Sequence, residues 1–427
     1  MFRQKISHLV TWKNNPKRKP LIVNGARQVG KSWLIRHFGE THFKGSFIEI
    51  NLEKSKNLHL IFKHDFDVSR IIFELNLALN TTIDPKKTLL FIDEVQSCPE
   101  ALGCLRYFFE DLPDLHIIVA GSLLDFEFRN QPFPVGRVEI MNLYPMTFYE
   151  FLHARSKHNL IQLLEKPINA IPDNINQYFY NDFLLYLIIG GMPECVQYFI
   201  TTNDLLGLKK IQDDLLYSYE QDFKKYQPNI NADCLLDILE NSAKLIGNQV
   251  IYIKLSNRFS SPTIKKGVDV LRTARLLHSV NNVSVSGLPL TASGKQFKIF
   301  FLDVGLLLRK SNIDYQHLYL KKELSVAFKG LLSEQFVAQQ LIAQTESKTF
   351  YWSRTEIGAS SKIDFVILNN NKIVPIEVKS GKSGSLKSLH YLLSKNPTIE
   401  QAIVFSEAKR GTIDKIEFVP IYWAGQC

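Results

Sequence analysis

The chain has 427 residues, of which 45% are hydrophobic and 22% charged, a globular composition with apolar mass for more than one core. The formal net charge of +9 favours polyanionic partners such as nucleic acid or nucleotides. The five cysteines are scattered, which fits a reducing compartment and disfavours a zinc site. An apolar signal segment and bilayer-length apolar runs are both missing, so we expect a cytoplasmic protein without membrane contact.

Short apolar strands alternate with helical segments in the first third of the chain. The apolar runs at residues 21–24, 47–52, 88–92 and 116–120 read as strands, and residues 31–38 read as a helix. Strands that alternate with helices are typical of a parallel sheet. We therefore expect an α/β fold in this part.

The loop after the first strand matches the phosphate-binding pattern G-x-x-x-x-G-K-[ST]. In this pattern backbone N–H groups cradle phosphates, Lys31 reaches the β- and γ-phosphates, and the Ser32 hydroxyl ligates Mg²⁺. The helix that begins here turns the positive end of its dipole toward the anion. The predicted nucleotide-binding residues are Gly25, Ala26, Arg27, Gln28, Val29, Gly30, Lys31 and Ser32.

A second apolar strand ends in two adjacent carboxylates. Asp93 is suited to hold Mg²⁺, and Glu94 to polarise the attacking water, as phosphoryl transfer requires. Ser122, after the next strand, either senses the γ-phosphate or is a small turn residue. Arg137 either stabilises transition-state charge or is an exposed basic residue.

These motifs together are similar to a known family. The tracts GARQVGKS, FIDEVQ, AGS and GRVEIMNLYPMTFYEFL resemble the prokaryotic AAA-superfamily ATPases, with archaeal-type ATPases as more distant relatives. The resemblance covers about the first 155 residues. It implies ATP and Mg²⁺ as cofactors and Lys31, Ser32, Asp93, Glu94 and Arg137 as catalytic or binding residues, together with Ser122. Oligomers are possible, and whether Arg129 or Arg137 acts in cis or in trans stays open.

The middle of the chain predicts a winged helix. Residues 254–259 read as a helix, followed by a turn and a second helix from Ser261, and strands near 283–285 and 298–302 would form the wing. The outward face carries Lys254, Arg258, Lys265, Lys266, Arg272 and Arg275. Such a face would contact DNA phosphates, or it would be the solvated side of a packing or protein-binding module.

The last block predicts a second α/β unit. A helix at 328–344 is followed by strands at 349–352, 362–368, 373–379 and 401–405. Asp364, Glu377 and Lys379 share one sheet face, where two carboxylates and a lysine can hold a metal and orient a water.

Glu334, Asp364 and the Glu377-x-Lys379 pair resemble the PD-(D/E)xK nuclease superfamily. That likeness implies Asp364 and Glu377 as Mg²⁺ ligands, Lys379 as the catalytic lysine and Glu334 as the residue that completes the metal site.

The expected architecture is a P-loop NTPase sheet with a helical lid, a winged-helix-like middle and a restriction-endonuclease-like C-terminal domain. The expected domains are residues 1–155, 156–230, 231–311 and 312–427. The first functional hypothesis is an ATPase that acts on DNA and drives a metal-dependent nuclease domain. The alternative is a nucleotide-regulated DNA- or protein-binding ATPase whose nuclease-like domain does not cleave. A third interpretation is an ATP-driven switch without nucleic acid.

Overall fold

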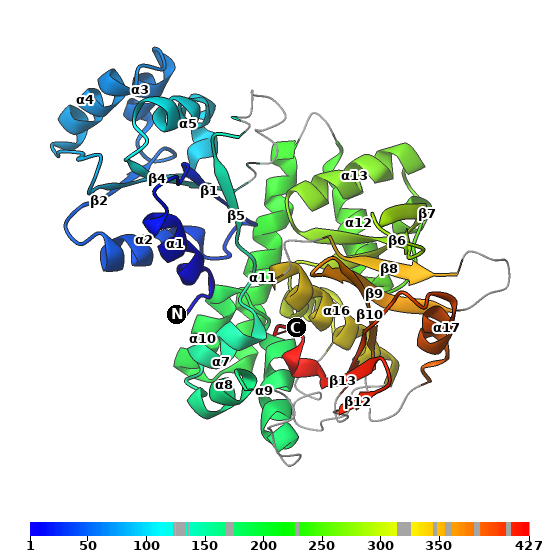
Figure 1. The fold of residues 1–427 in the computed structure, drawn as a ribbon. Helices are drawn as coiled ribbons and strands as arrows, with labels where there is room; N and C mark the ends of the chain where they lie inside the picture. Colours follow the sequence, from blue (N-terminus) through cyan, green and yellow to red (C-terminus); the bar gives the residue numbers. More distant parts are fainter. Residues whose placement is uncertain are drawn as a thin grey trace. The chain divides into compact units, whose positions relative to one another are not determined.

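The computed structural model describes residues 1–122, 124, 134, 136–166, 175–226, 230–313, 326–344, 348–354, 361–379, 385–406 and 411–426. The chain divides into two compact units, Phe2–Tyr144 and Pro145–Cys427, the latter together with Met1. This division falls about ten residues before the boundary expected from the sequence. Figure 1 shows the elements of both units.

The N-terminal unit contains a parallel sheet of five strands in the order β2-β3-β4-β1-β5. Its strands are β1 (Leu21–Asn24), β2 (Phe47–Asn51), β3 (Leu89–Asp93), β4 (His116–Gly121) and β5 (Glu139–Asn142). The parallel sheet is confirmed, and four strands lie where the apolar runs predicted them. β5 was not predicted, because its residues are mostly half-exposed and lack an apolar run.

Helices cover both faces of this sheet (Figure 1). They are α1 (Lys5–Asn14), α2 (Lys31–His42), α3 (His59–Lys63), α4 (Val68–Leu79) and α5 (Pro99–Asp111). α1 and α2 lie on one face, and α3 to α5 on the other. Because both faces are covered, every residue of β1, β3 and β4 is buried.

The second unit begins with a helical region. Its helices are α7 (Phe148–Ala154), α8 (His158–Leu164), α9 (Asn176–Ile189), α10 (Pro193–Thr202) and α11 (Leu205–Asp222). Thr147 and Glu150 form a capping box that begins α7. Buried aromatic rings of α7 and α9 pack on Phe336, so the region shares its core with a later helix. The helical character is confirmed, and a lid function stays a prediction.

The rest of this unit is built on a mixed sheet of eight strands in the order β12-β13-β11-β10-β9-β8-β6-β7. Its strands are β6 (Leu277–Ser284), β7 (Thr291–Phe301), β8 (Phe350–Ser353), β9 (Lys362–Asn369), β10 (Lys372–Val378), β11 (Ala402–Ser406), β12 (Gly411–Ile413) and β13 (Ile416–Pro420). β9 and β10 lie where strands were predicted, and they pair as an antiparallel hairpin. Asn370 and Asn371 in its turn have positive φ, which asparagine tolerates.

The helices of this part are α12 (Ala232–Leu245), α13 (Ser261–Thr273), α14 (Val304–Lys310), α16 (Val326–Gln344) and α17 (Lys387–Lys395). β6 pairs in parallel with β8, so the expected middle domain and C-terminal domain share one sheet. None of the helices in the described part of the chain combines the length and apolarity that a bilayer crossing requires.

Candidate functional site

The phosphate loop lies between β1 and α2, as the motif requires. Gly30 caps α2 with φ 92°, a left-handed conformation that glycine adopts without strain. Lys31 is buried, and its Nζ donates to Gly25 O at 2.9 Å and to Ala26 O at 2.7 Å. The lysine therefore points into the loop whose backbone is expected to hold phosphate.

Arg3 donates a hydrogen bond to the backbone of this loop, and the sequence did not indicate this role for Arg3. The buried Arg3 guanidinium donates to Val29 O at 3.0 Å and to Tyr144 O at 2.6 Å. It thereby joins the phosphate loop to the segment that follows β5. No sequence signal could have found it, because its partners are backbone carbonyls more than twenty residues away along the chain.

The structure brings Ser32, Asp93 and Glu94 together. Burial raises the pKa of Asp93, with a smaller contribution from the charge of Glu94, and a hydrogen bond from Ser32 opposes this shift. Ser32 lies in the first turn of α2, which follows β1, and Asp93 ends β3, so the two residues come from β1 and β3, the neighbours of β4 in the sheet. An oxygen pair of this kind suits Mg²⁺, which prefers hard oxygen ligands.

Ser122 lies at the end of β4 within reach of the loop. Its Oγ accepts from Arg27 Nε at 3.2 Å, so a loop residue and the candidate sensor are in direct contact. Gln96, the last residue of the tract FIDEVQ, is a second residue to which the sequence assigned no role. Its amide donates to Glu94, and its other amide atom, Oε1, is buried without a hydrogen-bond partner.

Arg137 has a partner of its own. Its Nε donates to Glu110 Oε1 at 2.9 Å, and Arg106 donates to the same oxygen at 3.2 Å. In this conformation the Arg137 side chain is bound to the Glu110 carboxylate. Arg137 would have to break this ion pair before it could act on phosphate. Arg129 lies outside the described residues.

In the second unit, the structure gathers the four residues expected to form a nuclease-like site. Asp364 Oδ2 accepts from the Val378 backbone N–H at 3.0 Å, and Lys379 Nζ donates to Glu377 Oε1 at 2.5 Å. Burial raises the pKa of both Glu334 and Glu377 to about 7.

A fifth residue, Lys298 on β7, lies at the centre of this cluster. Its fully buried Nζ donates to Glu334 Oε1 at 2.6 Å and to Asp364 Oδ1 at 3.3 Å. Burial alone would lower the pKa of Lys298, but the charges of Glu334 and Asp364 outweigh it and raise the pKa. Sequence reasoning missed Lys298 because it lies outside the D…E-x-K spacing, in the segment expected to be a wing.

Comparison with known protein families decides the nature of the N-terminal unit. Residues 17–152 match the AAA domain. This part of the chain is an AAA-type P-loop ATPase domain. Residues 180–317 and 329–423 match two domains of unknown function, DUF8612 and DUF4143. Neither of these matches tests the winged-helix or the nuclease interpretation of the residues that follow the AAA domain.

Similar proteins add little about activity. An uncharacterized protein of Methanocaldococcus jannaschii is 23% identical over 280 residues, which cover 62% of this chain and 57% of that protein. The Walker-type ATPase of Pyrococcus abyssi has 15% identity and a TM-score of 0.45, covering 73% of this chain and 95% of that one. A STAND protein with a tetratricopeptide repeat sensor from Pyrococcus horikoshii has 13% identity and a TM-score of 0.27, covering 81% and 46%.

In the observed conformation, the carboxylates of Glu334, Asp364 and Glu377 do not form a site for a divalent metal. Among the residues that the structure describes, no group of three or more His, Cys, Asp or Glu side chains could hold a metal ion. The Lys298 ammonium lies between Glu334 and Asp364, at 2.6 Å from Oε1 of the first and 3.3 Å from Oδ1 of the second. The metal role expected for Glu334, Asp364 and Glu377 stays a prediction.

The predicted helix-turn-helix is also corrected in part. Residues 256–260 are not helical, and only a 3-10 turn, Tyr252–Leu255, precedes α13. Ser256 is extended, and its hydroxyl donates to Asp237 at 2.8 Å, which pulls the chain away from a helical path. The helix before α13 is α12, and β6 and β7 pair antiparallel in the segment expected to form the wing.

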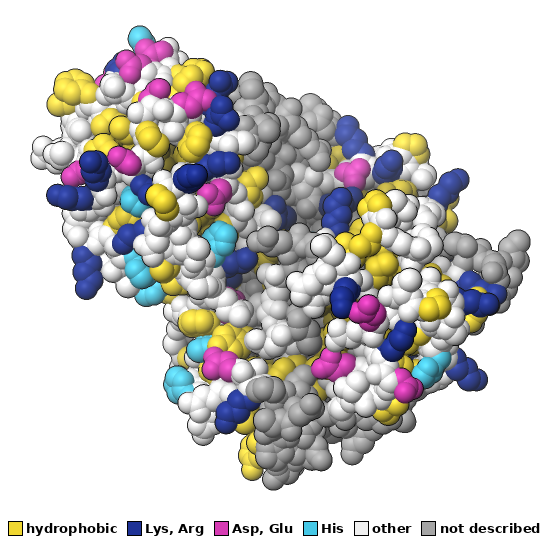
Figure 2. Space-filling view, in the orientation of Figure 1, with side chains coloured by type: hydrophobic (Ala, Val, Ile, Leu, Met, Phe, Trp, Pro, Cys, Tyr) yellow, Lys and Arg dark blue, Asp and Glu magenta, His cyan; other side chains and the backbone are white. Residues whose placement is uncertain are grey.

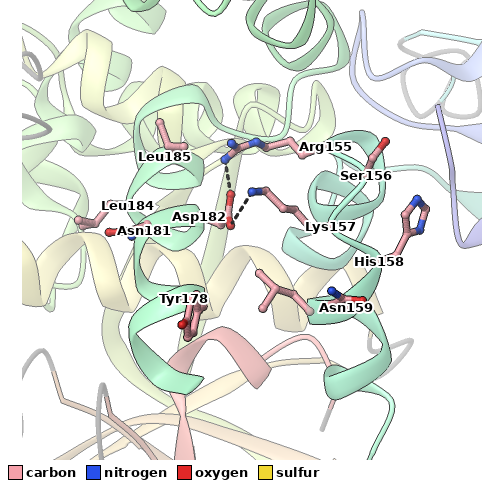
Figure 3. A pocket seen from close by; sticks show the side chains of 11 residues that line it. Arg155, Ser156, Lys157, His158, Asn159, Tyr178, Asn181, Asp182, Leu184 and Leu185 are labelled. Carbon is pink, nitrogen blue, oxygen red and sulfur yellow. Dashed lines mark hydrogen bonds and ion pairs between the residues drawn. The ribbon is translucent and has the colours of Figure 1, made fainter. Parts of the chain in front are cut away.

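A cavity of about 740 Å³ lies in the helical region, between the α7–α8 turn and α9 (Figure 3). Asp182 lies at its centre and pairs with Arg155 and with Lys157, the latter at 3.8 Å. These charged groups largely satisfy one another, and none of the residues expected to be functional lines the cavity.

Proposed function

We propose that the protein binds ATP with Mg²⁺ and hydrolyses it at the phosphate loop of the AAA domain. The observation that supports this most directly is the convergence of Lys31, Ser32 and Asp93–Glu94 at the ends of β1 and β3. A triphosphate would replace Gly25 O and Ala26 O as the partners of Lys31. Glu94 would then orient the attacking water.

The Ser32 hydroxyl and the Asp93 carboxylate are the residues that would hold Mg²⁺, directly or through water. When bound, the ion supplies neutralisation of charge on the β- and γ-phosphates. The raised pKa of Asp93 supports this assignment, because a buried carboxylate next to Glu94 is stabilised by a cation.

ATP turnover by purified protein tests the proposal. Lys31→Ala is expected to weaken ATP binding and abolish turnover, whereas Glu94→Gln is expected to keep binding and stall hydrolysis. Glu53→Gln, an exposed carboxylate after β2, is the matched control and should behave like the parent protein. Unchanged turnover in Glu94→Gln would remove Glu94 from the proposed mechanism.

We further propose that the protein contacts DNA through a basic face. Lys254, Lys265 and Lys266 are exposed on the 3-10 turn and on α13, and none has a carboxylate partner within the described residues. Arg258 and Arg272 are instead paired with Asp237 and Asp269. Figure 2 shows Lys and Arg side chains gathered over the α13 region. Cations without a partner are the groups that neutralise phosphate with release of counterions.

The salt dependence of binding to a DNA duplex tests this second proposal. The double variant Lys265→Ala/Lys266→Ala is expected to bind more weakly, with a salt slope shallower by about 2, since each phosphate contact contributes about 0.9. Lys86→Ala/Lys87→Ala, an exposed lysine pair in the AAA domain, is the control. Salt-independent binding, or no binding, would favour a protein partner for this face.

For the C-terminal carboxylates, Lys298 supports the alternative in which the nuclease-like part does not cleave. The proposed role of the second unit is therefore DNA or protein binding under the control of ATP turnover. A cleavage assay with Mg²⁺ or Mn²⁺ tests this choice. Cutting that is lost in both Asp364→Ala and Lys379→Ala would restore the nuclease hypothesis.

A further inference from the structure

The acidic cluster of the second unit is already neutralised by the chain itself. Lys298 Nζ is fully buried and contacts oxygens of Glu334 and of Asp364, both side chain and backbone, at 2.6–3.4 Å. An ammonium has three hydrogens to donate and accepts none, so these oxygens use its donors. The aromatic rings of Tyr351 and Phe365 lie within 5.8 Å of the same nitrogen and favour a cation there.

The remaining oxygens of the cluster are also engaged or enclosed. Asp364 Oδ2 accepts from Val378 N–H, and Glu377 Oε1 accepts from Lys379. An added Cβ at Gly247 would lie 2.7 Å from Glu334 Oε2, so the backbone closes over that oxygen. Only Glu377 Oε2 is buried without a partner in this cluster, among the described residues.

The position that a divalent ion would take between the carboxylates is therefore already occupied by the Lys298 ammonium. Mg²⁺ needs several oxygens at about 2.1 Å, and the carboxylates that would supply them converge on Lys298. The lysine side chain has no solvent exposure and extends from the middle of a strand pair.

We propose that Lys298 is the resident cation of this cluster and that it excludes Mg²⁺ and Mn²⁺ from Glu334 and Asp364. The inference does not rest on ATP turnover by the AAA domain. Its consequence is specific: removing the ammonium while keeping the side-chain volume, as in Lys298→Met, leaves facing carboxylates that a divalent ion would bind.

Mn²⁺ binding, followed by electron paramagnetic resonance of nucleotide-free protein, tests the proposal. All proteins carry Asp93→Asn, so that the nucleotide site lacks the carboxylate proposed to hold its Mg²⁺. The parent protein is expected to bind no Mn²⁺ at the cluster, and Lys298→Met is expected to gain one site that Asp364→Asn removes. Lys295→Met, an exposed lysine on the same strand, should gain nothing.

Two results would overturn the proposal. One is Mn²⁺ binding in the parent protein that Asp364→Asn abolishes, and the other is a folded Lys298→Met variant that gains no site. If Lys298→Met does not fold, acetylation of native amines, read by mass spectrometry, replaces it. Lys298 should then react only after denaturation, and labelling of native protein as fast as at Lys295 would contradict the assignment. Because no step uses nucleotide, failure here is distinguishable from failure of the ATPase proposal.

Discussion

Gln96 donates its side-chain amide to Glu94, the residue proposed to activate water, and Glu94 itself has a left-handed backbone with φ 50°. The Gln96 side chain also lies against Gly121 at the end of β4, where an added Cβ would be 2.2 Å from Gln96 Oε1. The carboxylate of Glu94 is thus held by a side chain that packs beside the candidate sensor, Ser122.

Replacing Gln96 should slow hydrolysis without weakening ATP binding. In Gln96→Ala the Glu94 carboxylate loses its tether, and misplacement of a catalytic group by about 1 Å can cost up to about 10²-fold in rate. We expect kcat to fall with little change in KM. Gly121→Ala should act in the same direction, because the new methyl group displaces Gln96. Equal losses in kcat and in ATP affinity would instead indicate a general disturbance of the loop.

Arg3→Met should weaken both the fold and the nucleotide site of the AAA domain. Two hydrogen bonds from a charged donor to Val29 O and Tyr144 O are lost, which we expect to cost about 2–4 kcal/mol of unfolding free energy. ATP affinity, measured by calorimetry, should fall because the loop is no longer braced. Arg106→Met is the control, since that side chain is 54% exposed. A variant with parental affinity would limit Arg3 to stability alone.

Acid should destabilise the AAA domain through His116. Burial lowers the pKa of His116 to about 4, and its Nδ1 is buried without a partner between Trp12 and Phe43. The unfolded chain, with a pKa of about 6.5, binds the proton first. The contribution of neutral His116 to the free energy of unfolding is therefore fully present above about pH 6.5. It is lost as the pH falls toward about 4, by up to roughly 3 kcal/mol.

Urea unfolding of His116→Phe at pH values across this range checks the prediction. The variant should lose most of the acid sensitivity, while His64→Gln, an exposed histidine, should keep it. Parallel pH profiles for the parent and His116→Phe would rule out His116 as the source.

Asp303→Ala should destabilise the second unit. Asp303 is fully buried and accepts from the N–H groups of Gly191 and Gly305 and from Gln339, so it joins three segments of the chain. Leaving these donors without a partner should cost about 3 kcal/mol or more. Asp213→Ala, a carboxylate that is 49% exposed, is the control in denaturant unfolding. Loss of stability equal in both variants would deny Asp303 its connecting role.

The AAA domain could be predicted from the sequence because its signals are local. The phosphate loop and the apolar run before Asp93 each lie within one short stretch, and the structure places both as expected. What escaped prediction was non-local. Arg3 bonds to carbonyls far along the chain, and the contact between Gln96 and Glu94 depends on a 3-10 turn, although Gln96 itself lies in the tract FIDEVQ.

The second unit was harder for the same reason. The spacing of Asp364, Glu377 and Lys379 correctly placed these residues together, but it could not reveal the position of Lys298 on β7. The charge of one buried lysine changes the chemistry of the whole cluster. The helix expected at residues 254–259 failed because a side chain–side chain bond between Ser256 and Asp237 overrides the local helical periodicity.

The parallel pairing of β6 with β8 has a practical consequence for any attempt to dissect this protein. A fragment that ends or begins near residue 312 would expose an unpaired strand edge, and such edges promote aggregation. It would also separate Glu334 and Asp364 from the Lys298 ammonium. The two segments matched by separate families of unknown function are thus not interchangeable modules. Recombinant pieces or chimaeras of this region should carry residues 145–427 intact.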